Sequence, residues 1–147
     1  MRTQPPPMQN LVPALGIYVS IPFCRAKCSY CNFASGVYGA DRMAAYVKKL
    51  TAQIREAPER VAASGVRLPK SVDSVYFGGG TPSLLYVNQL EGILQAIREV
   101  FSFDAAAEIT LECAPGQLSE EMLHAMPRLG FNRVSLGVQS FVDHEAS

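Results

Sequence analysis

The stretch of sequence most informative about the architecture spans residues 71–82 and reads SVDSVYFGGGTP. Residues 71–77 are rich in β-branched and aromatic side chains, so we predict a strand there. Three glycines then turn the chain sharply, because glycine accepts backbone conformations that other residues avoid. Downstream, apolar residues recur at three- and four-residue spacing from Val87 to Phe101, which is the pattern of a helix with one buried face. This strand–turn–helix order is the repeating unit of an α/β fold.

The same alternation extends in both directions along the chain. Further strands are expected at residues 17–21, 108–113 and 133–138, with helices in the intervals between them. The resulting order, β-α-β-α-β-α-β, predicts a parallel sheet with right-handed crossovers, either open or curved into a barrel. In both forms ligands bind at the carboxyl ends of the strands, so functional residues are expected along that edge.

Apolar spacing and capping residues indicate the other two helices. A stripe from Met43 to Ile54 predicts the first of them, with Asp41 as its cap and Pro58 at its end. Ser119 can cap a short last helix.

The composition is that of an ordinary globular domain. The chain has 147 residues, of which 48% are hydrophobic, enough to bury a core. Its 13 basic and 13 acidic residues cancel, which gives no support for a nucleic-acid or membrane-surface partner. No stretch approaches the roughly 18 apolar residues that a membrane-spanning helix needs. The proline-rich residues 1–14 lack the apolar run of a secretory signal, so we expect a flexible lead-in, a core domain over residues 15–147 and a cytoplasmic protein.

Three cysteines follow the first strand with the spacing C-x3-C-x2-C: Cys24, Cys28 and Cys31. Thiols this close together cannot all pair as disulfides, whereas soft thiolates suit iron–sulfur clusters, zinc or copper(I). A structural zinc site would need a fourth ligand, and the other candidates are far away in sequence. A four-iron cluster on three cysteines instead leaves one iron open to a substrate or cofactor. The spacing therefore favours such a cluster, with a zinc knuckle or free thiols as the alternative.

Candidate ligand residues also follow the next three strands. Residues 78–82 form either a tight connection or a place where the backbone approaches a ligand. Glu112 is either an exposed rim residue or a carboxylate that binds ribose hydroxyls. Gln139 follows the fourth strand. Together with the cysteines, these residues occupy four successive strand ends on one rim, which a random scatter of structural residues would not favour.

Two tyrosines have two possible roles each, and one further cysteine is given a structural role. Tyr18 is either a core aromatic or a site residue, and Tyr30 lies between two cysteines, where it could cover a cluster or contact a cofactor. Cys113 is interpreted as an inert packed thiol.

Four segments, YVSIPFCRAKCSYCNF, VYFGGGTPSLL, EITLECAPG and GFNRVSLGVQSF, together resemble the radical S-adenosylmethionine (SAM) superfamily. Over residues 15–141 the chain resembles one of its branches, the oxygen-independent coproporphyrinogen III oxidases (HemN) and the related haem chaperones (HemW). The resemblance implies a partial (β/α)6 barrel, of which this chain supplies four βα-type units. It also implies a [4Fe–4S] cluster whose open iron binds the methionine end of SAM. An electron from that cluster cleaves the sulfonium and releases a 5′-deoxyadenosyl radical.

The resemblance also implies roles for individual residues. The cluster ligands would be Cys24, Cys28 and Cys31. Contacts to the SAM bound on that cluster would come from Tyr18, Gly79 and Glu112. Positions associated with a second SAM in the oxidases are matched by Tyr30, Gly80, Thr81 and Gln139.

Two departures from the family pattern affect the functional expectation. HemN proteins have Gly-Cys straight after the third cluster cysteine, where this chain has Asn32-Phe33, as in the HemW branch. Many relatives have His at the position of Ser20, so this chain lacks the imidazole for any role assigned to that His. We therefore expect a HemW-like protein that binds a cluster and SAM and handles haem. The alternatives are a coproporphyrinogen III oxidase and a non-catalytic metal-binding fragment.

The implied partners are haem or porphyrin and an electron donor such as flavodoxin or ferredoxin. The family's haem- and substrate-associated C-terminal regions have no counterpart in this sequence. We therefore expect that these 147 residues alone do not form an autonomous enzyme.

Overall fold

The structure, a computed structural model, describes residues 14–138 and 140–142. Strands and helices alternate along it in the predicted order. They are β1 (Ala14–Ile21), α1 (Ala40–Ala62), β2 (Ser71–Gly79), α2 (Val87–Val100), β3 (Ser102–Cys113), α3 (Glu120–Leu129) and β4 (Arg133–Leu136), with the short 3-10 helix η1 (Pro82–Leu84) before α2. Within the described residues no helix is both long and apolar enough to cross a membrane.

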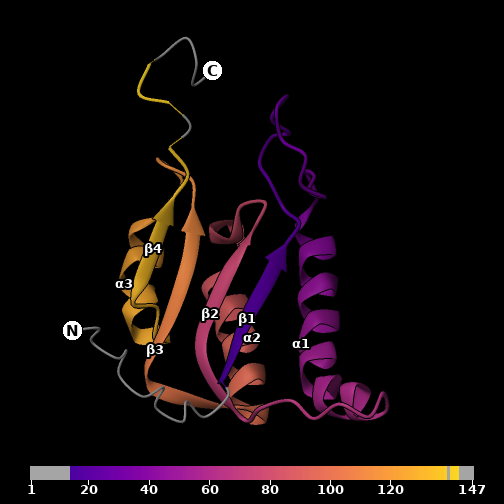
Figure 1. Ribbon diagram of the computed structural model, residues 1–147. Helices are drawn as coiled ribbons and strands as arrows, with labels where there is room; N and C mark the ends of the chain where they lie inside the picture. The colour runs from indigo at the N-terminus through magenta and orange to yellow at the C-terminus, as the bar shows by residue number, and fades with distance from the viewer. Residues whose placement is uncertain (1–13, 139, 143–147) are drawn as a thin grey trace, which may run out of the picture.

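The four strands form one parallel sheet in the order β1-β2-β3-β4, which confirms the predicted α/β fold. All four arrowheads point to the same edge in Figure 1, and the long loop after β1 rises above that edge. The carboxyl ends of the strands therefore share one rim, as the sequence predicts.

The core lies between the sheet and the helices, which cover one of its faces (Figure 1). Alternate strand residues such as Val19, Phe77 and Leu111 are buried there because successive side chains of a strand point to opposite faces. Helix α2 contributes fully buried Leu90 and Ile97 to the same core. The other face of the sheet is called the open face below, and it carries the intervening residues of each strand.

All four strands differ in length from the expectation. β1 begins at Ala14, three residues early, and β2 ends at Gly79, two residues late. β3 begins at Ser102, six residues before the predicted start at 108. Residues 104–106 are Asp-Ala-Ala, which have low strand propensity and are exposed, so nothing in the pattern marks them as a strand. The start of the strand is joined to β2, where Ser102 and Phe103 lie opposite Ser71 and Val72, and after a shift in register the pairing resumes with Glu108 opposite Ser74. β4 ends at Leu136, two residues earlier than predicted.

Helix α1 also departs from the prediction at both ends. Its N-cap is Gly39, whose side chain offers no capping oxygen, while Asp41 lies inside the first turn. An acidic residue there is still favourable because the first turn has unpaired N–H groups. At the other end the helix continues past Pro58 to Ala62, because a proline removes only one helical hydrogen bond. The cap of α3 is confirmed, since Ser119 accepts a hydrogen bond from the Met122 N–H at 3.1 Å.

Candidate functional site

A cavity of about 430 Å³ lies at the rim where the strands end. It is lined from the loop after β1 by Cys24, Cys28, Tyr30 and Cys31. The turn after β2 contributes Gly79, Gly80 and Thr81, and the end of β3 contributes Glu112. Eight of the ten residues singled out from the sequence thus meet in one cavity. Of the other two, Tyr18 lies on the open face beside it, and Gln139 is outside the described residues.

The loop between β1 and α1, residues 22–39, is called the cysteine loop here. Its base is closed by hydrogen bonds from the Cys24 N–H to the Gly36 carbonyl, at 2.9 Å, and from the Gly36 N–H to the Pro22 carbonyl, at 3.0 Å. Phe23 is buried at this base and packs edge-on against Tyr38 and Tyr46. The loop is therefore anchored to the core directly before the first cysteine.

The glycine turn is joined to the cysteine loop through backbone hydrogen bonds. The Gly80 N–H donates to the Ile21 carbonyl at 2.8 Å, and the Thr81 N–H donates to the Phe23 carbonyl at 2.7 Å. A Cβ on Gly80 would lie 2.5 Å from the Phe23 carbonyl oxygen and 2.9 Å from the Cys24 Sγ. Any side chain at position 80 would therefore clash with the Phe23 carbonyl oxygen and the Cys24 sulfur.

Gly79 has two independent reasons to be glycine. Its φ of +111° is a conformation that other residues avoid. A Cβ there would also lie 3.1 Å from the Ile21 carbonyl oxygen. Thr81 is the N-cap residue of η1, but its side chain makes no capping hydrogen bond.

The three loop cysteines fit an iron–sulfur group by donor chemistry. All three are free, and they belong to one loop that lines one cavity. Soft thiolates are the ligands that iron–sulfur clusters use, and the space beside Gly80 lets the turn approach Cys24 closely. Among the described residues, no three His, Cys, Asp or Glu side chains stand close enough together to hold a metal ion. The role of the cysteines as ligands therefore stays a prediction.

Tyr18 and Glu112 come together over Gly78 on the open face. A Cβ on Gly78 would lie 2.7 Å from the Tyr18 hydroxyl and 2.9 Å from Glu112 Oε2. Burial raises the pKa of Tyr18, and the Glu112 carboxylate and Tyr76 raise it further. Tyr18 is 56% exposed and stacks on Tyr76 with ring centroids 5.7 Å apart. Tyr18 is therefore not a core aromatic but part of a rim pair with Glu112.

Two other residues lie close to the cysteines. A hydrogen bond with the Cys28 side chain raises the pKa of Tyr30, and burial and the Cys28 and Cys31 thiols add to this. Cys113 also borders the cavity but is only 2% exposed, and burial raises the pKa of its thiol. Its interpretation as a packed thiol agrees with both observations.

Sequence reasoning missed Gln117, which also borders the cavity. Its Oε1 is buried and has no hydrogen-bond partner among the described residues. Gln117 follows the Pro115-Gly116 turn after β3, so the strand-end rule could have indicated it.

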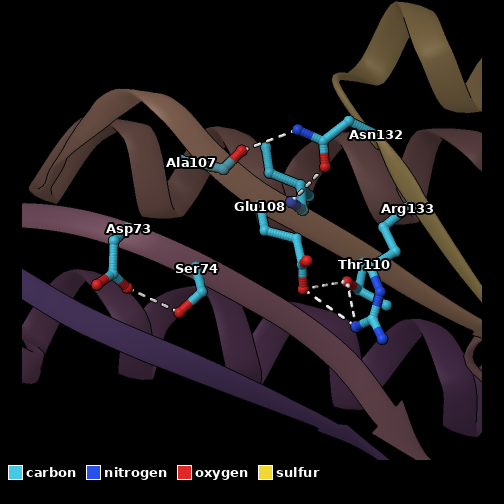
Figure 2. A network of polar contacts seen from close by, with 8 residues as sticks. Asp73, Ser74, Ala107, Glu108, Thr110, Asn132 and Arg133 are labelled. Carbon is cyan, nitrogen blue, oxygen red and sulfur yellow. Dashed lines mark hydrogen bonds and ion pairs between the residues drawn. The ribbon is translucent and has the colours of Figure 1, made fainter.

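A polar network on β3 and β4 supports this rim from below (Figure 2). Arg133 donates to Glu108 at 3.1 Å, and Thr110 donates to the same Glu108 oxygen at 3.1 Å. Asn132 binds the β3 backbone with both ends of its amide, accepting from the Ile109 N–H at 2.8 Å and donating to the Ala107 carbonyl at 2.9 Å. The side chain of Asn132 thereby continues the β3–β4 pairing by one step.

Comparison with known protein families agrees with this geometry. The model of the radical SAM superfamily matches residues 18–145. The chain belongs to the radical SAM superfamily. Membership implies a [4Fe–4S] cluster and SAM as cofactors, and the match includes the cysteine loop, the glycine turn and the Glu112 strand end.

The individual relatives include haem chaperones HemW and oxygen-independent coproporphyrinogen III oxidases. The chain is 39% identical to the haem chaperone HemW of Synechocystis over 86% of its own length and 30% of that protein. It is 36% identical to the oxygen-independent coproporphyrinogen III oxidase of Bradyrhizobium diazoefficiens, over 85% of this chain and 27% of that one. Among solved structures, the Escherichia coli coproporphyrinogen III oxidase HemN, described as a radical SAM enzyme, matches with a TM-score of 0.73 and 31% identity. That match covers 89% of this chain and 29% of HemN.

These radical SAM relatives establish the fold, but they match only part of their own length to this chain. The four-stranded sheet corresponds to part of the HemN fold, as the resemblance predicted. The chain spans about 30% of the length of the HemW proteins it matches, so the activity of the whole protein is a matter for proposal.

Proposed function

We propose that the cavity holds a [4Fe–4S] cluster on Cys24, Cys28 and Cys31, with SAM bound beside it. The observation that supports this most strongly is the meeting of the cysteine loop, the glycine turn and Glu112 in one cavity. When bound, the cluster would supply one electron for the reductive cleavage of SAM. The residues of this chain would hold and orient the two cofactors.

The contacts proposed for the SAM on the cluster are supported by the chemistry of the residues. Gly79 lets the backbone approach a ligand, because it has no side chain and a positive φ. Glu112 can accept hydrogen bonds from ribose hydroxyls, and Tyr18 lies beside it. Tyr30, Gly80, Thr81 and Gln139 are proposed for a second SAM, as in the oxidases that they resemble.

For the whole protein we propose a HemW-like role in handling haem in the cytoplasm. The support is the similarity to HemW proteins together with Asn32-Phe33 in place of the Gly-Cys of HemN. An electron donor of the flavodoxin or ferredoxin kind would reduce the cluster. The second candidate is a coproporphyrinogen III oxidase, favoured by the similarity to the oxidases and to the HemN structure.

Haem titration and a coproporphyrinogen assay separate these two candidates. Both should be run on a full-length homologue that carries the same four segments. The HemW-like proposal expects stoichiometric haem binding and no conversion of coproporphyrinogen to protoporphyrinogen. Conversion in step with SAM consumption would overturn it in favour of the oxidase. A homologue that binds neither haem nor a cluster would favour a non-catalytic module.

A further inference from the structure

One side chain crosses the cysteine loop from its outgoing arm to its returning arm. The Lys27 ammonium donates to the Phe33 carbonyl at 2.8 Å and to the Ser35 carbonyl at 3.2 Å. Lys27 lies between the first and second cysteines, and both acceptors lie after the third. These contacts join the two arms well beyond the base of the loop, where the Pro22–Cys24 segment meets Gly36.

The hydrogen bonds of Lys27 and those at the base divide the loop into two parts, and the cysteines are distributed between them. Cys28 and Cys31 lie inside the small ring that Lys27 closes with Phe33. Within this ring the Cys31 N–H donates to the Cys28 carbonyl at 3.2 Å, so the two cysteines share one turn. Cys24 lies between this ring and the base of the loop, where its N–H is bonded to Gly36.

A ring of this kind matters because ordering a flexible loop costs conformational entropy. Without such a ring, the loop must become ordered when a metal group binds its three thiolates, and this loss of entropy weakens binding. A loop already held in shape binds more tightly because part of the cost has been met in advance. A lysine suits this position since its ammonium has three donors and can bind two backbone carbonyls together.

We propose that Lys27 is a positioning residue that closes the cysteine loop in the metal-free chain and thereby prepares the three cysteines to take up iron and sulfide. The second half of this proposal rests on the proposed function, whereas the first half does not. The two can therefore be tested separately on the same variants of the full chain.

The first measurement is backbone hydrogen exchange of the metal-free chain. Lys27→Met removes the donors and keeps most of the side-chain length. We expect the bonded loop amides of Cys24, Cys31 and Gly36 to exchange about tenfold faster in this variant, while amides of β2 and β3 keep their protection. Lys27→Arg should restore most of the protection because it supplies donors again. Lys49→Met is the matched control, since Lys49 is an exposed lysine on α1, outside the cysteine loop.

The second measurement is the iron and sulfide kept after anaerobic reconstitution and a timed challenge with a chelator. Lys27→Met should lose iron about tenfold faster than the unmodified chain, with Lys27→Arg and Lys49→Met close to it. Unchanged exchange of the loop amides in Lys27→Met would overturn the loop closure. Faster exchange with unchanged iron retention would overturn its link to metal uptake. If the unmodified chain takes up no iron, the proposed function fails, and hydrogen exchange still decides whether Lys27 closes the loop.

Discussion

Gly78 leaves the space in which the Tyr18 hydroxyl and the Glu112 carboxylate meet. A methyl group at this position would stand within 3 Å of both, so Gly78→Ala must displace at least one of them. We expect this variant to bind SAM roughly tenfold more weakly, with the iron content unchanged, as measured by calorimetry on the reconstituted chain. Gly92→Ala is the control, because a Cβ at Gly92 meets no atom within 4 Å. Equal SAM affinity for Gly78→Ala and Gly92→Ala would show that the space over Gly78 is unimportant.

Removal of the Glu112 carboxylate should have a larger effect on the same equilibrium. Hydrogen bonds to a charged group contribute roughly 1.5–3 kcal/mol, so Glu112→Ala is expected to weaken SAM binding about ten- to a hundredfold. Iron content should stay near that of the unmodified chain, since Glu112 is not a proposed ligand. Glu59→Ala, an exposed glutamate on α1, serves as the control. An unaltered SAM affinity in Glu112→Ala would refute the ribose role.

The raised pKa of Cys113 predicts a pH-dependent difference between the cysteines. Burial disfavours the thiolate, so the thiol stays protonated to a higher pH than the ordinary thiol value of about 8.5. In the metal-free chain at pH 8, iodoacetamide should alkylate exposed Cys28 at least about tenfold faster than Cys113, as followed by mass spectrometry. The Cys113 rate should rise only above the ordinary thiol range or on unfolding. Equal rates at pH 8 would contradict the burial of this thiol.

At the level of single residues, the sequence predicted which residues line the cavity better than it predicted what surrounds them. The cysteine spacing and the glycine turn can be recognised in the sequence because few structural roles need those residues in that order. The approach of Tyr18 to Glu112 could not be predicted, since it depends on how the β1, β2 and β3 ends lie beside one another. The Lys27 hydrogen bonds could not be predicted either, since they depend on how the cysteine loop folds back on itself. The buried Gln117 oxygen, which has no hydrogen-bond partner in the described part of the chain, is likewise visible only in three dimensions.

Asn132 fixes the register of β4 against β3 through two side-chain hydrogen bonds. Asn132→Ala removes both and leaves the Ile109 N–H and the Ala107 carbonyl without these partners. We expect the free energy of unfolding in urea to fall by about 1–3 kcal/mol. Asn88→Ala, at an exposed position of α2, should change it by less than about 0.5 kcal/mol. A change in Asn132→Ala no larger than in Asn88→Ala would show that backbone pairing alone sets the register.

Helices and strands could be predicted where their apolar pattern is periodic, but not where contacts with neighbouring segments determine them. The stripe of α2 and the Ser119 cap of α3 appear in the structure as expected, because local spacing and local hydrogen bonds determine them. The first half of β3 was missed since Ala105 and Ala106 favour no strand, and this segment is joined to β2 by the pairs that Ser102 and Phe103 form. The extension of α1 beyond Pro58 was missed for a similar reason, because the hydrogen bonds that continue the helix outweigh the one that proline lacks.

Among the described residues β4 pairs on one side only, with β3. Val134 and Leu136 are exposed by 42% and 55%, and a strand edge with apolar side chains invites association. We expect the chain to self-associate with rising concentration in sedimentation velocity. Leu136→Lys should reduce this association, whereas Leu123→Lys should not, since Leu123 is a similarly exposed leucine on α3. Association that is equally strong in both variants would locate the contact elsewhere.

The whole-molecule claim is that the ends of β1, β2 and β3 form one site for a cluster and SAM. The most direct test is the electron paramagnetic resonance spectrum of the anaerobically reconstituted and reduced chain, recorded with and without SAM. We predict a [4Fe–4S]+ signal that changes shape when SAM is added. It should be absent from Cys24→Ala, Cys28→Ala and Cys31→Ala, and present in Cys113→Ala. A signal that ignores SAM, or that persists in Cys28→Ala and disappears in Cys113→Ala, would contradict this account.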